Sequence, residues 1–364
     1  MQPDFSGRLI AWQRTHGRHS LPWQNTRDPY RVWLSEIMLQ QTQVVTVLGY
    51  YARFLDKFPD VQALAAATLD EVFALWSGLG YYSRARNMHR CAQAVVAEHG
   101  GSFPNTSVSL QGLPGIGRST AAAIAAFCFS ERVAILDGNV KRVLTRVLGF
   151  DGDLAVAAQE RALWMQATEM LPTDGIEAYT QGLMDLGATL CSARSPQCLL
   201  CPVQVDCTAV RVGQPEKFPV KTRKLKRGFR EHLWLWLSWQ DLIWLVQRPP
   251  VGVWAGLWSL PEFASREALA AVNADWPGDA QSLPSFTHTL THLDIALHPL
   301  CWNLPKHISA ICLEAVTSAC VAVDGAGQWF SLDQALAMGL PAPLRKLLLS
   351  DFKPERRARG VAPA

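Results

Sequence analysis

The sequence has no run of 18 or more apolar residues, which a membrane-spanning helix would require. Its first residues, MQPDFSGRLIAWQRTHG, contain neither an apolar core segment nor a small-residue cleavage site, so we expect no secretory leader. Internal repeats and low-complexity tracts are also lacking. These absences argue against membrane and secreted proteins, and they predict a globular protein of the cytoplasm, where thiols stay reduced.

An excess of charge of either sign is missing as well, since 34 Lys and Arg face 31 Asp and Glu. The net charge of +3 permits a nucleic-acid partner but argues only weakly for one. With 49% hydrophobic and 18% charged residues, the 364-residue chain is long enough for two or three globular domains.

The composition of the chain changes between residues 211 and 230. Before this segment, long runs rich in Leu and Ala with Gly or Pro between them predict a helical domain over residues 1–210. The segment itself carries eight Lys or Arg against one Glu, which predicts a solvated basic linker over residues 211–228. Beyond it, HLWLWLSW and LIWLVQR predict strands, while REALAAV and LDQALAM predict short helices. We therefore expect an α+β domain over residues 229–352 and a basic tail over 353–364.

Four cysteines lie within seventeen residues, at gaps of six, two and five: Cys191, Cys198, Cys201 and Cys207. Four unrelated core thiols would explain this poorly, because such a local density has little packing rationale. The spacing alone fits a tetrahedral zinc site and an iron–sulfur cluster equally well, although the long first gap favours iron–sulfur.

The cysteine pattern C-x6-C-x2-C-x5-C resembles the [4Fe–4S] loop of the endonuclease III superfamily of DNA glycosylases. That resemblance implies a [4Fe–4S] cofactor held by all four thiolates, in a cluster subdomain over residues 191–207. It also implies that Arg194, inside the first gap, lies on a loop used against the DNA backbone.

A second motif, LPGIGRSTAAAIAAF, places a glycine turn directly before an Ala-rich helix. Free N–H groups at such a helix start point toward an anion and can hold a phosphate oxygen without reading sequence. A plain helix–helix turn is the alternative. With ILDGNVKRV twenty residues on, however, the motif resembles the helix-hairpin-helix of the same superfamily, which implies a six-helix barrel. The implied DNA contacts in this hairpin are Leu113, Gly115, Gly117, Arg118 and Ser119.

Breaking an N-glycosidic bond requires a proton for the leaving base and stabilisation of a cationic sugar, tasks that carboxyl groups perform in glycosidases. Asp137 is one candidate, although just before a helix it would also serve as an N-cap. Glu36 is the other, and we expect it to share one helical face with Gln40 and Gln43. Its apolar neighbours would raise the pKa of its carboxyl group, whereas a solvated face is the alternative.

The stretches LPWQNTRDPYRVWLSEIMLQQTQV and GLGYYSRARN resemble adenine DNA glycosylases of the MutY type. By that resemblance Glu36 protonates the flipped adenine and then manages the attacking water, and Asp137 stabilises the sugar cation. Tyr81 would be the wedge that enters the base stack, with further DNA contacts from Gln41 and Asn139. Tyr81 as a core aromatic is the alternative.

A lysine is missing where bifunctional endonuclease III relatives carry their Schiff-base nucleophile, and Ser119 stands at that position. Arg118 cannot replace the lysine, because its guanidinium stays protonated. We therefore expect base removal by water without strand cleavage.

The stretch QRPPVGVWAGLWSLPEF resembles the Nudix-like domain that MutY-type enzymes carry, but the metal-binding Glu cluster of working Nudix hydrolases is absent. We therefore interpret this domain as a binding module. In that family an F-S-H loop recognises 8-oxoguanine opposite the adenine. The matching residues here are Leu290, Thr291 and His292, although His292 could also be a strand surface residue.

Together these patterns predict a multidomain protein: an all-α helix-hairpin-helix glycosylase domain with a [4Fe–4S] loop, plus an α+β Nudix-like domain. We expect a monomeric, monofunctional enzyme that excises adenine mispaired with 8-oxoguanine or guanine in double-stranded DNA. Bound to DNA in a bacterial cytoplasm, it would be associated with the nucleoid. One rival is a bifunctional oxidised-pyrimidine glycosylase with lyase activity. A non-catalytic iron–sulfur DNA-binding protein is another, and it would leave Glu36 and Asp137 idle.

Overall fold

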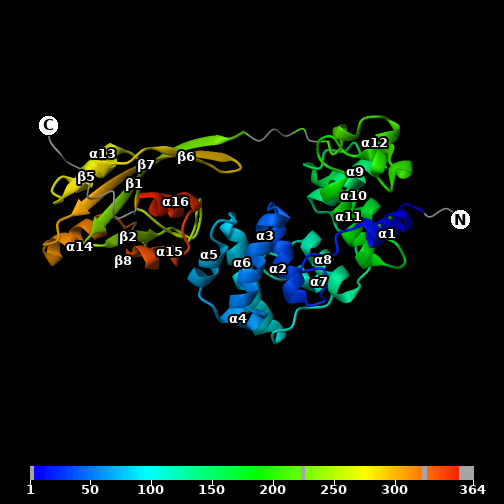
Figure 1. Cartoon of the computed structure of the whole chain (residues 1–364), viewed down its shortest axis with the longest axis horizontal. Helices are drawn as coiled ribbons and strands as arrows, with labels where there is room; N and C mark the ends of the chain where they lie inside the picture. The colour runs from blue at the N-terminus through cyan, green and yellow to red at the C-terminus, as the bar shows by residue number, and fades with distance from the viewer. Residues whose placement is uncertain (1–3, 221, 223–225, 322–325, 352–364) are drawn as a thin grey trace. The chain divides into compact units, whose positions relative to one another are not determined.

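The computed structural model describes residues 4–220, 222, 226–321 and 326–351. The expected basic tail and four residues of the expected linker lie outside this described part. The chain divides into two compact units (Figure 1). The first unit contains Met1–Ala65 and Arg90–Lys224, and the second contains Ala66–His89 and Leu225–Ala364. No helix within the described ranges is both long and apolar enough to cross a membrane.

The first unit is helical, as the sequence predicts. Three of its helices begin at an aspartate whose side chain accepts a hydrogen bond from a first-turn amide, a favourable N-cap for an exposed helix start. Its helices are α1 (Phe5–His16), α2 (Pro29–Leu39), α3 (Val44–Lys57), α4 (Val61–Ala66), α7 (Ser107–Leu110), α8 (Arg118–Phe129), α9 (Gly138–Leu148), α10 (Ala157–Glu169), α11 (Ile176–Thr189) and α12 (Thr208–Arg211), with short 3-10 turns η1 (Cys198–Leu200), η2 (Gln204–Asp206) and η3 (Pro215–Lys217).

The break between α2 and α3 corrects one expectation from the sequence. The helix carrying Glu36 ends at Leu39, and Gln41 has a φ of 58°. A residue in this left-handed conformation cannot continue a right-handed helix. The prediction that Glu36, Gln40 and Gln43 share one helical face is therefore wrong, because Gln40 and Gln43 lie at helix ends.

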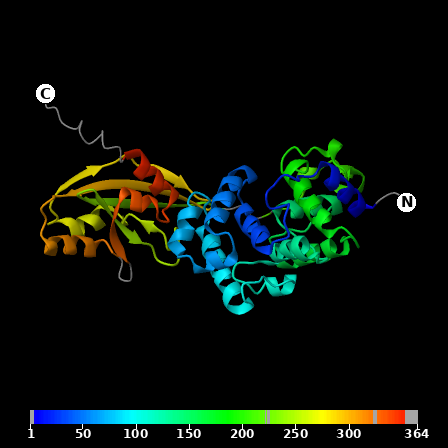
Figure 2. The same cartoon turned by 60° about the horizontal axis from the view of Figure 1, so that its bottom comes forward.

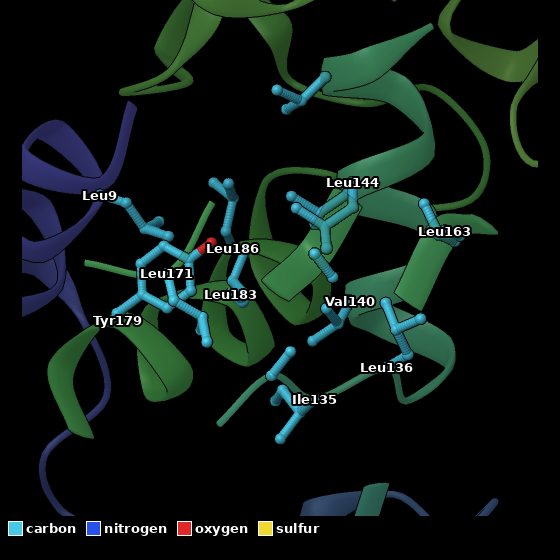
Figure 3. Packing of buried hydrophobic residues seen from close by; sticks show 14 of the residues in the cluster. Leu9, Ile135, Leu136, Val140, Leu144, Leu163, Leu171, Tyr179, Leu183 and Leu186 are labelled. Atoms are coloured by element: carbon cyan, nitrogen blue, oxygen red, sulfur yellow. The ribbon is translucent and has the colours of Figure 1, made fainter. Parts of the chain in front are cut away.

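A hydrophobic core joins α1, α9, α10 and α11 (Figure 3). Leu9, Val140, Leu163 and Leu186 are completely buried in it, and Leu183 is nearly so. Each buried leucine contributes about 1.5–3 kcal/mol relative to its exposed state. This packing fixes the first turn of α9 and the polar positions of α11, and both belong to the site described below.

The start of the expected linker is anchored to this core at one point, although residues 211–214, 216 and 217 are exposed. Phe218 contacts the core, and the backbone carbonyls of Pro215 and Phe218 accept hydrogen bonds from Arg146 Nε at 2.8 and 3.2 Å. Arg146 itself is only 2% exposed. The composition of the segment does not predict this anchoring, because Arg146 lies about 70 residues earlier in the chain.

The second unit is built on a mixed eight-stranded sheet. Its longest pair, β1 and β7, is parallel and runs in register from Gly228↔Leu293 to Trp239↔Leu304. Along this sheet the order is β3-β2-β1-β7-β5, with β4 paired to β1, β6 to β7 and β8 to β2. The strands are β1 (Gly228–Trp239), β2 (Leu242–Gln247), β3 (Trp258–Ser259), β4 (Glu262–Phe263), β5 (Asp279–Ser282), β6 (Phe286–Thr289), β7 (Leu293–Leu304) and β8 (Gly327–Ser331).

Helices cover both faces of this sheet (Figure 2). On one face, α13 (Arg266–Asn273) and α14 (Ala310–Ala319) pack against alternate residues of β1, namely Leu233, Leu235 and Leu237. The helices of the second unit are α13 (Arg266–Asn273), α14 (Ala310–Ala319), α15 (Leu332–Leu336) and α16 (Ala342–Asp351), with α5 (Leu69–Trp76) and the start of α6 (Tyr82–His99). The predicted strands and short helices are present, while α14 and α16 were not expected.

Residues 66–89 belong to the second unit through specific contacts. Tyr82 Oη donates to the Leu340 carbonyl at 2.9 Å, and Arg345 Nε donates to Ser77 Oγ at 2.9 Å. Trp258 Nε1 reaches Asp70 at 3.4 Å. These bonds tie the segment that carries Tyr81 to the sheet unit.

Candidate active site and nucleic-acid interface

Glu36 lies in the last turn of α2, where most neighbouring positions are buried and apolar. Burial raises the pKa of its carboxyl group to about 8, and the negative charge of Asp137 adds to this rise. At neutral pH the group is therefore mostly protonated. A neutral carboxylic acid is what a general acid must be before it donates its proton.

Asp137 is the N-cap of α9, and its Oδ1 accepts a hydrogen bond from the Val140 amide at 2.7 Å. Burial raises the pKa of Asp137, while backbone hydrogen bonds from Val140 and Asn139 and nearby positive charges lower it. Its charge acts on Glu36, so the structure brings together the two carboxyl groups singled out in the sequence. The cap bond therefore holds the Asp137 carboxylate at the start of α9, on the side of Glu36.

The first turn of α9 is tied to two neighbouring segments by Arg142. Its Nη2 donates to Asn139 Oδ1 at 2.8 Å and to the Gly187 carbonyl at 2.6 Å, and its Nε donates to the Cys191 carbonyl at 2.8 Å. A Cβ at Gly187 would lie 2.6 Å from the Cβ of Asn139, so no larger residue fits there without movement. This contact places Asn139 against α11 and beside Asp137.

A cavity of about 550 Å³ adjoins Glu36, a volume suited to a small ligand or a single base. Its walls include Trp23, Gln181 and Met184 as well as Glu36. Trp23, Gln181 and Met184 are not among the site residues predicted from the sequence. The available signal was QGLMDLGA, because Gln181 and Asp185 are polar residues one turn apart in an otherwise apolar stretch.

The glycine hairpin leads into α8 as expected. Gly115 has a φ of 76°, and Gly117 is the N-cap without a side chain to satisfy the first amides. Ser119 Oγ accepts a hydrogen bond from the Leu136 amide at 3.2 Å. Leu113 is only 4% exposed, so any contact it makes with DNA must come from its backbone. The exposed Arg118 lies over the ring of Trp164, with its Cζ 3.9 Å from the ring centroid.

The remaining predicted contact residues lie at exposed turns. Gln41 is in the turn between α2 and α3, and Tyr81, just before α6, has a φ of 49° and is 44% exposed. Thr291 and His292 are exposed in the loop between β6 and β7. Within the second unit, the hydroxyl groups of Tyr81 and Thr291 share a hydrogen bond. The expected wedge and the expected lesion loop therefore meet.

The four clustered cysteines lie close enough to influence one another's ionisation, and their negative charges oppose further thiolate formation. Burial is the main cause that raises the pKa of three of them, to about 12 for Cys201. The positive charge of Arg146 lowers the pKa of Cys198. Arg146 Nη1 also donates a hydrogen bond to Cys191 Sγ at 3.2 Å. The same nitrogen donates to the Ser192 carbonyl at 2.7 Å, and Nη2 donates to the Ala193 carbonyl at 3.2 Å.

Within the described residues, no group of three or more His, Cys, Asp or Glu side chains is arranged around a single metal ion. A [4Fe–4S] cluster makes a different demand, because each thiolate binds its own iron. The buried arginine beside Cys191 fits a group of bound thiolates, since its N–H donors and charge favour anionic sulfur. Arg194 is exposed on the same loop.

Comparison with known proteins adds family information to this geometry. Residues 34–167 match the family described as HhH-GPD superfamily base excision DNA repair protein, and residues 233–350 match the NUDIX domain. An adenine DNA glycosylase of Buchnera aphidicola (subspecies Acyrthosiphon pisum, strain APS) is 34% identical over 355 residues, covering 96% of this chain and 97% of that protein. The chain belongs to the adenine DNA glycosylase family. The resemblance seen in the sequence is thereby confirmed.

Two further comparisons agree with this assignment. The human adenine DNA glycosylase is 33% identical over 405 residues, covering 94% of this chain and 73% of that protein. A solved structure of a thermostable thymine-DNA glycosylase has a TM-score of 0.52 at 28% identity, covering 57% of this chain and 95% of that chain. The chain is thus a base excision repair glycosylase that acts on DNA and hydrolyses N-glycosyl bonds, and the lyase alternative is not favoured.

Proposed function

We propose that this enzyme excises adenine opposite 8-oxoguanine or guanine in duplex DNA, with Glu36 as the acid and Asp137 as the stabilising carboxylate. The observation that carries the proposal is the buried Glu36 carboxyl group in the wall of a base-sized cavity, electrostatically coupled to Asp137. Family membership supports adenine as the base, since the matched relatives are adenine DNA glycosylases. The enzyme flips the nucleotide out of the stack, because its target bond is inaccessible inside the duplex.

The proposed reaction begins with a proton from Glu36, which is neutral at physiological pH. The proton goes to a ring nitrogen of the flipped adenine, and the electron pair of the C1′–N9 bond leaves with the base. Water then attacks C1′ and gives its proton to the Glu36 carboxylate, which returns the acid to its starting state. A positioned acid of this kind contributes about 10²–10⁴ in rate.

Asp137 is proposed to stabilise the cationic sugar formed when the bond breaks. A carboxylate about 4 Å from a full positive charge is worth about 4 kcal/mol at an effective dielectric near 20, which is several hundredfold in rate. Its cap bond to the Val140 amide holds one oxygen in place, so the carboxylate is oriented before the reaction starts. Ser119 offers no amine at the hairpin, so a Schiff-base step and strand cleavage are not expected.

The surrounding turns are proposed to bind the duplex. The uncapped amides at the start of α8 would hold a phosphate, with Arg118, Asn139 and Arg194 adding polar contacts to the backbone. Gln41 would contact the DNA, and Tyr81 would enter the base stack as a wedge. Thr291 and His292 would read 8-oxoguanine on the opposite strand, and the hydrogen bond between Tyr81 and Thr291 supports a joint role. The enzyme is proposed to act as a monomer.

The clustered cysteines are proposed to hold a [4Fe–4S] cluster, which would order the loop carrying Arg194. The thiolates that would bind it are Cys191, Cys198, Cys201 and Cys207. Arg146 supports this assignment, because it binds both the first cysteine and the following backbone. The cluster would supply electrostatic and structural order to the loop, and no step of the proposed hydrolysis passes through it.

The proposal is tested by single-turnover excision on duplexes containing A:8-oxoguanine, A:G or A:T, comparing wild type with Glu36→Gln. Wild type is expected to yield alkali-labile sites at both mispairs and no strand breaks before alkali. Glu36→Gln should bind the mispair like wild type and lose at least 100-fold in rate, because the neutral acid is gone. The matched control is Glu98→Gln, an exposed site, which should react normally. Excision by Glu36→Gln at a tenth of the normal rate would remove Glu36 from the acid role.

A further inference from the structure

Asp185 is a buried carboxylate on α11 that the reaction above does not use. Its side chain is 1% exposed and accepts three hydrogen bonds. Oδ1 accepts from Arg18 Nε at 2.6 Å and from Gln181 Nε2 at 2.9 Å, while Oδ2 accepts from the Arg18 backbone amide at 2.9 Å. Gln181 lies one helical turn before Asp185 and lines the cavity beside Glu36.

These bonds determine which end of the Gln181 amide faces the carboxylate. A carboxylate only accepts hydrogen bonds, so the amide nitrogen of Gln181 must point to Asp185. The amide oxygen then points away from Asp185. In the described part of the chain this oxygen has no hydrogen-bond partner. The cavity wall therefore presents an acceptor whose orientation is fixed from behind by a fully engaged carboxylate.

We propose that Asp185 is a positioning residue, which holds Gln181 as an acceptor and makes the cavity select a base with an exocyclic amino group. This inference rests on the proposed function, because it takes the cavity to be the site of the flipped base. Adenine carries an amino donor at carbon 6, whereas hypoxanthine carries an oxygen acceptor there. A fixed amide oxygen of Gln181 would accept a hydrogen bond from the amino group of adenine. It would repel the oxygen of hypoxanthine, and both oxygens would then lack a hydrogen-bond partner.

Asp185→Asn removes this fixed orientation while keeping the volume of the side chain. Three donors converge on Asp185, but an asparagine amide has only one oxygen to receive them. With the oxygen toward Gln181, the new NH2 group meets the Arg18 amide. With the oxygen toward the Arg18 amide, the NH2 group meets Gln181 and turns its amide around. Gln181 then no longer presents a defined acceptor to the base.

The test is single-turnover excision of adenine and of hypoxanthine, each opposite 8-oxoguanine, by the full-length protein. Wild type should prefer adenine, and in Asp185→Asn the ratio of the two rates should fall about tenfold, equivalent to about 1.4 kcal/mol. A loss of stability alone would slow both substrates equally and leave the ratio unchanged. An unchanged ratio in a folded Asp185→Asn protein overturns the positioning role.

A reciprocal exchange keeps the proposal testable if the single variant folds poorly. In Gln181→Glu with Asp185→Asn, the asparagine NH2 donates to one oxygen of the new carboxylate, and the other oxygen accepts from the base. The adenine preference should return to within about threefold of wild type. Gln181→Glu alone places its carboxylate one turn from that of Asp185, and this variant should lose the adenine preference. If the double variant discriminates no better than the single variants, the proposal fails. If wild type removes no adenine at all, the proposed function fails instead.

Discussion

Replacing Glu36 with glutamine should make the protein more stable at high pH while it abolishes excision. Burial raises the pKa of Glu36 from an ordinary 4.5 to about 8. Between these pH values the folded chain keeps a proton that the unfolded chain has lost. The contribution of Glu36 to stability therefore falls as pH rises from about 4.5 to about 8, and it stays low above that.

The size of this effect follows from the pKa shift. About 3.5 pH units at about 1.4 kcal/mol each give about 5 kcal/mol as an upper limit above pH 8. A glutamine side chain is neutral at every pH, so the variant escapes this cost. We expect Glu36→Gln to match wild type near pH 4.5 and to exceed it by at least about 2 kcal/mol near pH 8.5. The excision rate of wild type should also fall above pH 8, as the acid ionises.

The assay is urea unfolding at 25 °C, followed by tryptophan fluorescence and repeated at several pH values between 4.5 and 8.5. Glu98→Gln is the control, and its stability relative to wild type should not change with pH. If the difference between Glu36→Gln and wild type is the same at both ends of this range, Glu36 ionises like an exposed glutamate. It would then be charged at neutral pH, and the argument for a neutral acid would be refuted.

Two other outcomes test the surrounding assignments. Protein purified without oxygen should contain about four iron and four sulfide ions per chain. The Arg146→Met variant should lose its visible absorbance faster than wild type, because Cys191 loses its N–H donor. Stoichiometric zinc without sulfide would contradict the cluster. Thr291→Val should lower the preference for A:8-oxoguanine over A:G about fivefold in single-turnover assays. This factor corresponds to the loss of one hydrogen bond worth about 1 kcal/mol. An unchanged preference would show that Thr291 does not recognise the lesion.

How far the sequence predicts this molecule depends on whether a feature has a local cause. The helices of the first unit, the cap at Asp137 and the strands around HLWLWLSW all follow from short-range patterns. The break after Leu39 was missed because QQTQ contains no Gly or Pro, although Gln41 adopts a left-handed conformation. QGLMDLGA marks Asp185 as a polar residue in an apolar stretch, but its role depends on Arg18, a partner 167 residues away. Tertiary partners of this kind leave no periodicity in the sequence.

The contacts of residues 66–89 have a consequence for the modular history of the chain. This segment precedes the basic stretch by more than a hundred residues, yet Tyr82, Ser77 and Asp70 bond to residues after it. The second unit is therefore discontinuous in sequence, and a gene fusion at the basic stretch would transfer only part of it. To move the whole second unit onto another helical glycosylase, an engineer would have to transfer Ala66–His89 together with the sheet. A transfer without residues 66–89 would give the recipient the sheet but not the segment that carries Tyr81.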